Sequence, residues 1–297
     1  TTNIDSILAI GGGSSLDMAK IIKAIFFDIG SAAEIAVGKK KINVLNLPII
    51  AVPTTAGSGS EETHFAVVYV DGEKFSLASP CLKPDRAILD GLLLMSLPRY
   101  QRICSGLDAI AQAIESHWAV GATPESKKFA IAGLEKCWGN FTDYVNTSKV
   151  ESLQLMLHGA NLAGQAINIS KTTAAHAWSY GIAQRCSLPH GHAVWMTLPQ
   201  IFQIHADKCD GLNLEQSFST SLKDDIKALK EVISVGDEKP INFFKSFLSS
   251  FDLAHEFKDL GALSRSDRLA LAENVNLERL TNNPMNLAPY KSEIFNI

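Results

Sequence analysis

SILAIGGGSSLDMAKIIKAIFF, residues 6–27, decides how the first part of the chain folds. Its apolar opening, Ser6–Ile10, is typical of a buried strand, and the apolar spacing from Leu16 to Phe27 predicts a helix. The two are joined by Gly11, Gly12, Gly13 and Ser14. Such a junction points free backbone N–H groups and the positive helix end at an anion, so it predicts a phosphate-binding turn. Because the pattern is neither G-x-G-x-x-G nor a P-loop, a plain tight turn stays open.

A second buried-type strand, Leu47–Val52, leads into PTTAGSGS, residues 53–60. If the two strands are parallel neighbours, this small, hydroxyl-rich loop faces the glycine turn, because ligands gather at the carboxyl ends of such strands. We therefore expect the two loops to line a nucleotide together. The alternative is a flexible connector.

The rest of the chain divides into a short strand-rich part and a long helical part. Asp71-Gly72 predicts a hairpin between Phe65–Val70 and Lys74–Ala78, and Arg86–Leu89 is a further short strand. From Pro98 onward the periodicity is helical, at 100–119, 124–146, 151–169, 174–186, 192–206, 213–233 and 240–252. We predict an α/β domain over 1–98 and an all-α domain over 99–297.

Composition excludes several classes of function. The apolar content of 46% in 297 residues suits a large core, and the longest apolar runs are too short to cross a bilayer. The net charge is −4 and no arginine-rich stripe is present, so nucleic acid is not expected as a partner. Five scattered cysteines without a CxxC pair favour reduced, buried thiols. We expect a soluble cytoplasmic protein without a membrane partner.

Four polar residues of the helical part suggest a metal site. His176 and His190 lie 14 positions apart, the second inside a Pro-His-Gly turn, while Asp108 and Gln112 share one face of a predicted helix. Mixed N/O ligands suit Fe(II) or Zn(II) better than Ca²⁺ or Mg²⁺, although ligand type alone leaves the choice between the two open. Facing a nucleotide cradle, such an ion would act as a Lewis acid in hydride transfer to a carbonyl. Ordinary packing of the histidines is the alternative.

Several motifs in a fixed order resemble the iron-containing (group III) alcohol dehydrogenase family. They are IGGGSSLDMAK (10–20), PTTAGSGSE (53–61), GLDAIAQAIE (106–115), the segment from His176 to Pro189-His190-Gly191, and Asn283-Pro284. The resemblance implies a Rossmann-like dinucleotide-binding domain, a helical metal domain, and NAD(P)-dependent interconversion of short aldehydes and alcohols.

The resemblance also assigns the site by position. It implies cofactor contacts at Gly12, Gly13, Ser14, Asp17, Thr54, Thr55, Ser58 and Lys74. It implies metal ligands at Asp108, Gln112, His176 and His190, with Fe(II) favoured over Zn(II). For Asp17, in the first turn of its helix, an ordinary solvated position stays open. We further expect a homo-oligomer, a dimer.

Two positions depart from the family's pattern. Gln112 stands where the family usually has histidine, and its neutral amide oxygen is a weaker ligand. Tyr180 stands where a second histidine is common, so a phenol would relay protons there, or it simply packs. With Lys171, these departures are similar to the phosphonoacetaldehyde reductase branch. An anionic aldehyde would be bound by a cationic side chain. Lys171, five residues before His176, is the predicted cation. The alternative is a solvated lysine without a role in the site.

The chain begins at the strand that enters the glycine loop, whereas the family has further βα units before it. We therefore expect a dinucleotide domain cut short at its N-terminus, with the determinant of NAD against NADP outside this sequence. Two other classes stay open. One is a non-redox metal lyase resembling 3-dehydroquinate synthase, which would require more basic residues around its metal. The other is a binding protein that has lost its metal through Gln112.

Overall fold

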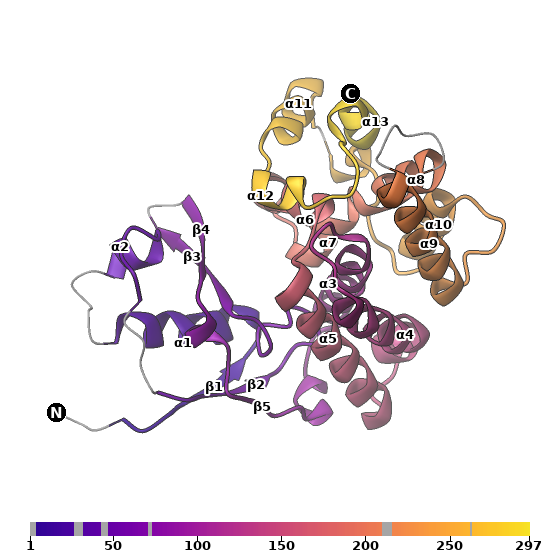
Figure 1. The fold of residues 1–297 in the computed structure, drawn as a ribbon. Helices are drawn as coiled ribbons and strands as arrows, with labels where there is room; N and C mark the ends of the chain where they lie inside the picture. Colours follow the sequence, from indigo (N-terminus) through magenta and orange to yellow (C-terminus); the bar gives the residue numbers. More distant parts are fainter. Residues whose placement is uncertain (1–3, 27–31, 43–46, 71–72, 210–215, 262) are drawn as a thin grey trace.

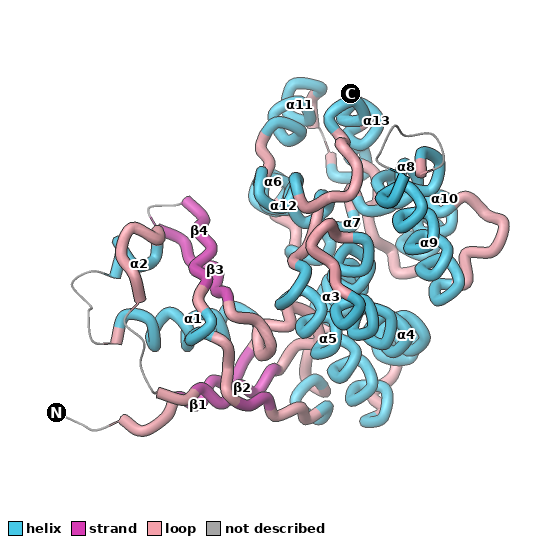
Figure 2. The backbone as a smooth tube through the Cα atoms, in the orientation of Figure 1, coloured by secondary structure: helices cyan, strands magenta, loops and turns pink. Residues whose placement is uncertain are grey.

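The structure, a computed structural model, describes residues 4–26, 32–42, 47–70, 73–209, 216–261 and 263–297. Figure 1 shows the strands gathered in the N-terminal part and helices throughout the remainder. The tube in Figure 2 shows the same division by secondary structure. The predicted combination of an α/β part and a helical part is therefore confirmed.

The glycine turn opens a small parallel sheet. Its strands are β1 (Ile7–Gly11), β2 (Ile49–Pro53) and β5 (Arg86–Ala87), in the order β1-β2-β5. Gly11 is paired with Pro53, so the carboxyl ends of β1 and β2 lie at the same edge, as predicted. The helix α1 (Gly13–Ile25) starts directly after β1. β5 is shorter than the predicted strand 86–89, because a 3-10 helix, η3 (Gly91–Leu94), soon follows it.

The antiparallel hairpin of β3 (Phe65–Val70) and β4 (Glu73–Ala78) also forms as expected. Its predicted turn, residues 71–72, lies outside the described residues. A short helix, α2 (Ala32–Ala36), was not predicted, because five residues are too few to establish a helical period. Another 3-10 helix, η2 (Pro80–Leu82), leads from the hairpin toward β5.

Charged residues of α1 fasten it to the hairpin. Lys20 is fully buried and its Nζ donates to the Thr63 Oγ1 and the Phe65 carbonyl, each at 2.9 Å. Asp17 accepts from the Ser60 Oγ at 2.5 Å and the Val67 amide at 3.0 Å. Burial lowers the pKa of Lys20 to about 8, although Asp17 opposes this change. These charges are part of the packing of the α/β part.

Eleven helices follow from residue 99 in the described chain. They are α3 (Arg99–Trp118), α4 (Pro124–Asn146), α5 (Val150–Ser170), α6 (Ala174–Cys186), α7 (His190–Trp195), α8 (Leu198–Lys208), α9 (Gln216–Ile233), α10 (Pro240–Ser249), α11 (Arg265–Glu273), α12 (Leu277–Thr281) and α13 (Lys291–Phe295). Two more 3-10 turns are η4 (Phe257–Leu260) and η5 (Ala288–Tyr290).

The predicted helix 192–206 is wrong as a single element, because it divides into α7 and α8. Pro199 is the reason. A proline inside a helix lacks the N–H and its ring collides with the carbonyl four residues earlier, here that of Trp195, whereas the first turn of a new helix accepts it. The break leaves α7 as a six-residue helix that carries His190 at its first position.

The helix α3 is the centre of the helical part. Nearly every residue from Arg102 to Trp118 is buried, and α4, α5 and α7 pack around it. The loop after β2 packs against this bundle. Gly59 has a φ of +61°, and a Cβ there would lie 2.4 Å from the Cα of Gly164 in α5. The loop is therefore a tightly packed contact and not a flexible connector.

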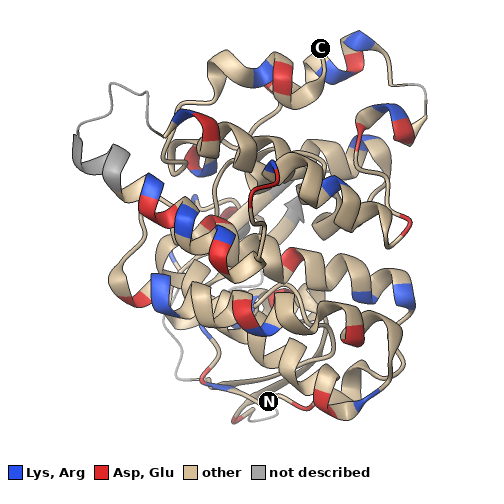
Figure 3. Cartoon of the chain, turned by 90° about the vertical axis from the view of Figure 1, so that its right-hand side faces the viewer, with Lys and Arg blue, Asp and Glu red and all other residues tan. Residues whose placement is uncertain are grey.

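The charge distribution and the helix lengths bear on two of the predicted exclusions. In the view of Figure 3, basic and acidic residues are interspersed along the helices, and the drawn face has no large basic stripe. Among the described residues, no helix combines the length and apolar character needed to span a bilayer.

Candidate metal centre

Three helices bring the predicted ligands together. Asp108 lies on α3, His176 on α6 and His190 at the start of α7. Gly191 makes the approach of α7 possible, because a Cβ there would lie 1.9 Å from the Cys104 carbonyl oxygen on α3. Trp195 at the other end of α7 donates from Nε1 to the Leu107 carbonyl at 2.8 Å. The Pro-His-Gly turn thus holds His190 against α3.

The ligand atoms of Asp108, His176 and His190 lie within 4.8 Å of one another. Nε2 of His176 is 3.3 Å from the Oδ1 of Asp108, and Nε2 of His190 is 3.8 Å from the same oxygen. The side chains of Asp108 and His176 are 10% and 3% exposed, while His190 is 38% exposed. Two imidazoles and a carboxylate facing one point suit a divalent transition metal, and the partly open His190 side leaves access from solvent.

The fourth predicted ligand, Gln112, has a buried oxygen that could coordinate the metal. The residue is buried one turn after Asp108, and its Oε1 has no hydrogen-bond partner among the described residues. A buried acceptor without a partner costs free energy, on the order of 1–3 kcal/mol. An amide oxygen can serve as a neutral metal ligand. The unpartnered atom therefore fits a metal bound by Asp108, Gln112, His176 and His190, which stays a prediction.

Electrostatics prepare the cluster for a cation. Burial opposes ionisation of Asp108, but the two neighbouring imidazoles outweigh it and hold the pKa of this carboxyl below its usual range. Burial likewise works against charging His176, but Glu115 and Asp108 raise the pKa of the imidazole above its usual value. The carboxylates are thus kept ionised, and a bound divalent cation would replace the proton at Nε2 of His176.

Glu115 is a residue that the site prediction missed. It is fully buried, and its Oε2 pairs with Nδ1 of His176. Its Oε1 accepts from the Thr173 Oγ1 at 2.7 Å and from the Ala175 amide at 2.8 Å. A carboxylate behind a ligand histidine fixes the tautomer and the orientation of the ring. The signal was its place seven residues after Asp108, on the same face of α3.

Tyr180, a predicted catalytic residue, lies beside the cluster. Its ring stacks on that of His190, with centroids 5.5 Å apart and an interplanar angle of 11°. The guanidinium carbon of Arg279, on α12, lies 5.7 Å from the centroid of the Tyr180 ring. The Tyr180 ring therefore contacts both a predicted metal ligand and a cation.

Lys171, the other predicted catalytic residue, has a carboxylate partner. Its Nζ forms an ion pair with Glu278 of α12, and its side chain is 50% exposed. The residue ends α5 with a φ of +60°, and its amide donates to the Ile167 carbonyl. Lys171 is therefore a paired surface cation at the C-terminus of α5, and its role in substrate binding stays a prediction.

Five of the predicted cofactor residues, Gly12, Gly13, Thr54, Thr55 and Ser58, lie at or just after the carboxyl ends of β1 and β2. A Cβ at Gly13 would lie 2.6 Å from the Ser58 Oγ, and one at Gly12 would lie 3.3 Å from Thr55. The two loops therefore face each other, as the parallel strands implied. The amide of Thr54 donates to the Gly11 carbonyl at 3.0 Å.

Three further cofactor predictions have different outcomes. Ser14 is exposed in the first turn of α1, open to a ligand. Both carboxylate oxygens of Asp17 are engaged inside the α/β part, so a direct contact with a cofactor is not what its geometry favours. Lys74 lies on β4, but its side chain is outside what the structure describes. The cofactor contacts as a set stay a prediction.

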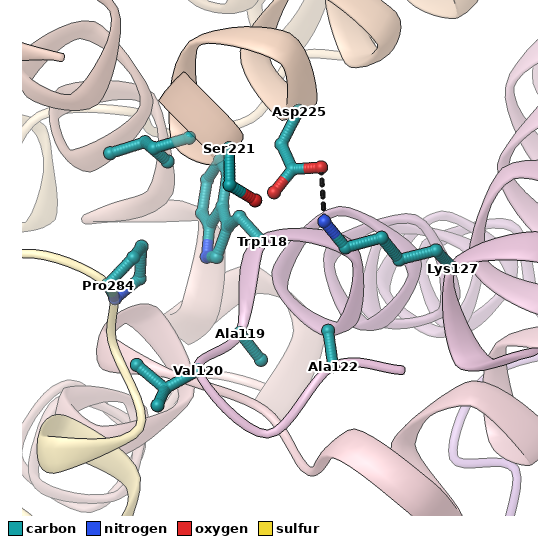
Figure 4. Close-up of a pocket in the computed structure, with 9 residues that line it drawn as sticks. Trp118, Ala119, Val120, Ala122, Lys127, Ser221, Asp225 and Pro284 are labelled. Carbon is teal, nitrogen blue, oxygen red and sulfur yellow. Dashed lines mark hydrogen bonds and ion pairs between the residues drawn. The ribbon is translucent and has the colours of Figure 1, made fainter. Parts of the chain in front are cut away.

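A separate cavity of about 270 Å³ lies beyond the end of α3. Trp118, Val120 and Pro284 form its apolar wall, and Lys127 donates to Asp225 at 2.5 Å beside them (Figure 4). Nε2 of His117 lies 3.3 Å from the same Asp225 oxygen. The charged residues that line this cavity are thus paired with each other. None of Asp108, His176 and His190 lines it.

Two families of known proteins match the sequence. The family described as iron-containing alcohol dehydrogenase matches residues 1–91, and the C-terminal part of the Fe-containing alcohol dehydrogenase family matches residues 102–296. The predicted boundary at residue 98 falls in the stretch between the two matches.

Individual relatives agree with these matches. The probable alcohol dehydrogenase EutG of Escherichia coli (strain K12) is 32% identical over 77% of the chain and 60% of the relative. The phosphonoacetaldehyde reductase of Streptomyces viridochromogenes is 32% identical over 67% of the chain and 53% of the relative. The chain thus spans about half to three fifths of the length of these curated relatives.

Solved structures share the fold. The sulfoacetaldehyde reductase of Bifidobacterium kashiwanohense, solved in complex with NAD+, has a TM-score of 0.79 and 26% identity. The match covers 98% of this chain and 75% of that one. An iron-containing alcohol dehydrogenase of Thermotoga maritima has a TM-score of 0.81 over 100% of this chain and 77% of that one. At 22% identity, the second likeness shows the fold alone.

Proposed function

Because the chain belongs to the iron-containing alcohol dehydrogenase family, we propose that it transfers hydride between a nicotinamide cofactor and a short aldehyde or alcohol. One observation carries the proposal: the ligand atoms of Asp108, His176 and His190 converge within 4.8 Å, beside the unpartnered Oε1 of Gln112. The facing glycine and hydroxyl loops support it, because they suit a dinucleotide. The lyase and the metal-free binding protein are not favoured, since the matched relatives are named as dehydrogenases and reductases.

The chain's own residues would divide the work as follows. Asp108, Gln112, His176 and His190 would hold the ion, which supplies a Lewis acid for the substrate oxygen when it is bound. Glu115 keeps the His176 ring oriented, so its Nε2 faces the site. The α1 N-terminus and the loop after β2 would bind and orient the cofactor. In the reduction, the aldehyde carbon gains a hydride and its oxygen a proton, so aldehyde and NAD(P)H become alcohol and NAD(P)+.

Tyr180 would carry the proton. Its ring is stacked on His190, which is 38% exposed, so the phenol lies at the open side of the cluster. Tyr180→Phe should therefore lower kcat more than it raises KM.

Three finer assignments belong to this proposal. Fe(II) is favoured over Zn(II) because of the family, and a relative solved with NAD+ favours NAD over NADP. An anionic aldehyde such as phosphonoacetaldehyde, reduced to 2-hydroxyethylphosphonate, is the favoured substrate, because relatives named for reducing phosphono- and sulfoacetaldehyde are among the matches. We also propose that the protein is cytoplasmic and forms a homodimer. Light scattering would test the homodimer.

A substrate panel tests the function. The full protein, reconstituted separately with Fe(II) and Zn(II), would be assayed with NADH and NADPH against phosphonoacetaldehyde, sulfoacetaldehyde and propanal. We expect aldehyde-dependent oxidation of the cofactor that disappears when a chelator removes the metal. Absence of turnover with every aldehyde in the metal-loaded protein would contradict the proposal.

A further inference from the structure

We propose that Arg279, rather than Lys171, binds the anionic end of the substrate. The inference rests on the proposed function, because it concerns the substrate of that same site. Lys171 lies at the end of α5, and Arg279 lies on α12, which packs against α6, the helix that carries His176. Their surroundings differ, and the difference decides between them.

Arg279 is connected to the metal cluster through rings. Its guanidinium carbon lies 5.7 Å from the centroid of the Tyr180 ring, which stacks on His190. The His190 ring in turn lies 5.4 Å, centroid to centroid, from that of His176. A substrate whose carbonyl oxygen reaches the cluster would extend past Tyr180 toward this guanidinium. Lys171 has no ring contact of this kind in the described chain.

The guanidinium is anchored while most of its donors stay available. Its Nη1 donates to the Oγ1 of Thr172, which is buried. Thr173, the next residue, donates to Glu115 at 2.7 Å, so the anchor lies one residue from the network that holds His176. The Asn276 side chain accepts from the Arg279 amide at 3.0 Å and fixes the start of α12. Arginine has five N–H donors, so the anchor leaves donors for a ligand.

Charge pairing separates the two cations. Lys171 is already paired with the Glu278 carboxylate. Within the described residues, Arg279 has no carboxylate within 4.0 Å, although Glu278 is its neighbour in sequence. The Glu278 carboxylate pairs with Lys171, and it interacts with Arg279 only at a longer range. An anion entering the site would meet a guanidinium that forms no ion pair within 4.0 Å among the described residues, whereas at Lys171 it would compete with Glu278.

The chemistry of the guanidinium indicates the ligand. Its planar fork matches two oxygens of a phosphonate, sulfonate or carboxylate and forms paired, charge-assisted hydrogen bonds. The favoured substrate is therefore a short aldehyde with such an oxyanion at its far end. A neutral aldehyde of the same length would leave the fork without a partner.

Matched variants test this assignment. In the metal-loaded full protein with NADH, kcat/KM would be measured for sulfoacetaldehyde, phosphonoacetaldehyde and propanal in wild type, Arg279→Met, Arg279→Lys and Lys171→Met. We expect Arg279→Met to lower kcat/KM for both anionic aldehydes about 10- to 100-fold, and for propanal by less than about threefold. Arg279→Lys should recover part of the loss, because it keeps the charge without the fork. Arg185→Met, which removes an exposed cation paired with Asp267, is the control.

Three outcomes would overturn the assignment. One is an equal loss for propanal and the anionic aldehydes, which would make Arg279 a support for Tyr180. Another is a larger change of the anionic-to-neutral ratio in Lys171→Met than in Arg279→Met. The third is a wild-type protein that reduces propanal as well as the anionic aldehydes.

A binding measurement separates this inference from the proposed function. Calorimetry with ethanesulfonate, an inert analogue, needs no turnover. If no aldehyde is reduced, the proposed function fails, and calorimetry still decides the assignment. Weaker binding of ethanesulfonate to Arg279→Met than to wild type, by about tenfold or more, supports it. Equal binding to both proteins contradicts it.

Discussion

The metal cluster and the glycine edge are two halves of one proposed site, but they are built in opposite ways. The cluster consists of side chains, and removing one atom from Asp108 or Glu115 would break it. The glycine edge consists of backbone and small side chains, and adding one atom at Gly13 would break it. The metal cluster is rigid because each buried charge depends on the hydrogen bonds and opposite charges around it. The glycine edge depends on the free space between its two loops. The two regions should therefore respond differently to substitution.

The largest effect is expected at Asp108. Asp108→Asn keeps the size of the side chain but removes the charge that both imidazoles face. We expect bound metal to fall below about a tenth of one ion per chain and kcat to fall by about 10³-fold, because buried metal cations require ionised ligands. Elemental analysis and steady-state kinetics measure both.

His205→Gln is the matched control for this substitution. His205 is also fully buried, on α8, and burial lowers its pKa to about 3, but it is not part of the cluster. The variant should keep its metal. Equal metal loss in Asp108→Asn and His205→Gln would show that any change in the helical core releases the metal. The contrast between the metal cluster and the glycine edge would then fail.

A smaller loss is expected at Glu115. Glu115→Gln keeps a hydrogen-bonding side chain behind His176 but removes the negative charge. Metal affinity should fall about 10- to 100-fold, because a carboxylate behind a ligand histidine raises its basicity and fixes its tautomer. Competition with a chromophoric chelator gives the affinity without any turnover. Unchanged affinity would restrict Glu115 to a structural role.

The glycine edge should respond to an added methyl group. In Gly13→Ala the new Cβ would lie 2.6 Å from the Ser58 Oγ, so the two loops must separate. We expect the Kd for NADH to rise about tenfold, a loss of about 1.4 kcal/mol, with metal content unchanged. Fluorescence titration measures it. Adding Ser58→Gly should recover part of the affinity, and no recovery would argue against the steric cause.

The smallest effect concerns pH and the buried Lys20. Its folded-state pKa, about 8, lies below the ordinary value of 10.5. Between these values the unfolded chain holds a proton that the folded chain has lost, so this residue makes stability rise with pH. The rise is at most about 1.4 kcal/mol per pH unit. From pH 8 to 9.5 the wild type should gain stability relative to Lys20→Met in urea unfolding. Parallel curves for the two proteins would contradict it.

The sequence predicted the fold where residue patterns dictate it. The alternation of strand, glycine turn and helix gave β1, α1 and β2, because each has a period and a clear boundary. It failed at 192–206, where apolar periodicity continued across a break caused by Pro199. It also missed α2, whose five residues are too few to show a period.

For the site, the sequence predicted functional residues only where they lie in or near a motif. Asp108, His176 and His190 were predicted to be near one another, and they are. Arg279 was not predicted, because nothing in a short helix 103 residues after His176 indicates that it reaches Tyr180. Lys171 was chosen for its proximity in sequence, but the packing of α12 gives it Glu278 as a partner. Long-range pairing of this kind depends on the tertiary arrangement.

One measurement tests the central claim most directly: an anomalous difference map from a crystal of the full protein grown with Fe(II), collected at the iron absorption edge. We predict a single strong peak per chain, bounded by Asp108, His176 and His190, with the Oε1 of Gln112 as the nearest remaining protein oxygen. No peak at this position, or a peak whose surroundings exclude Asp108, would contradict the account.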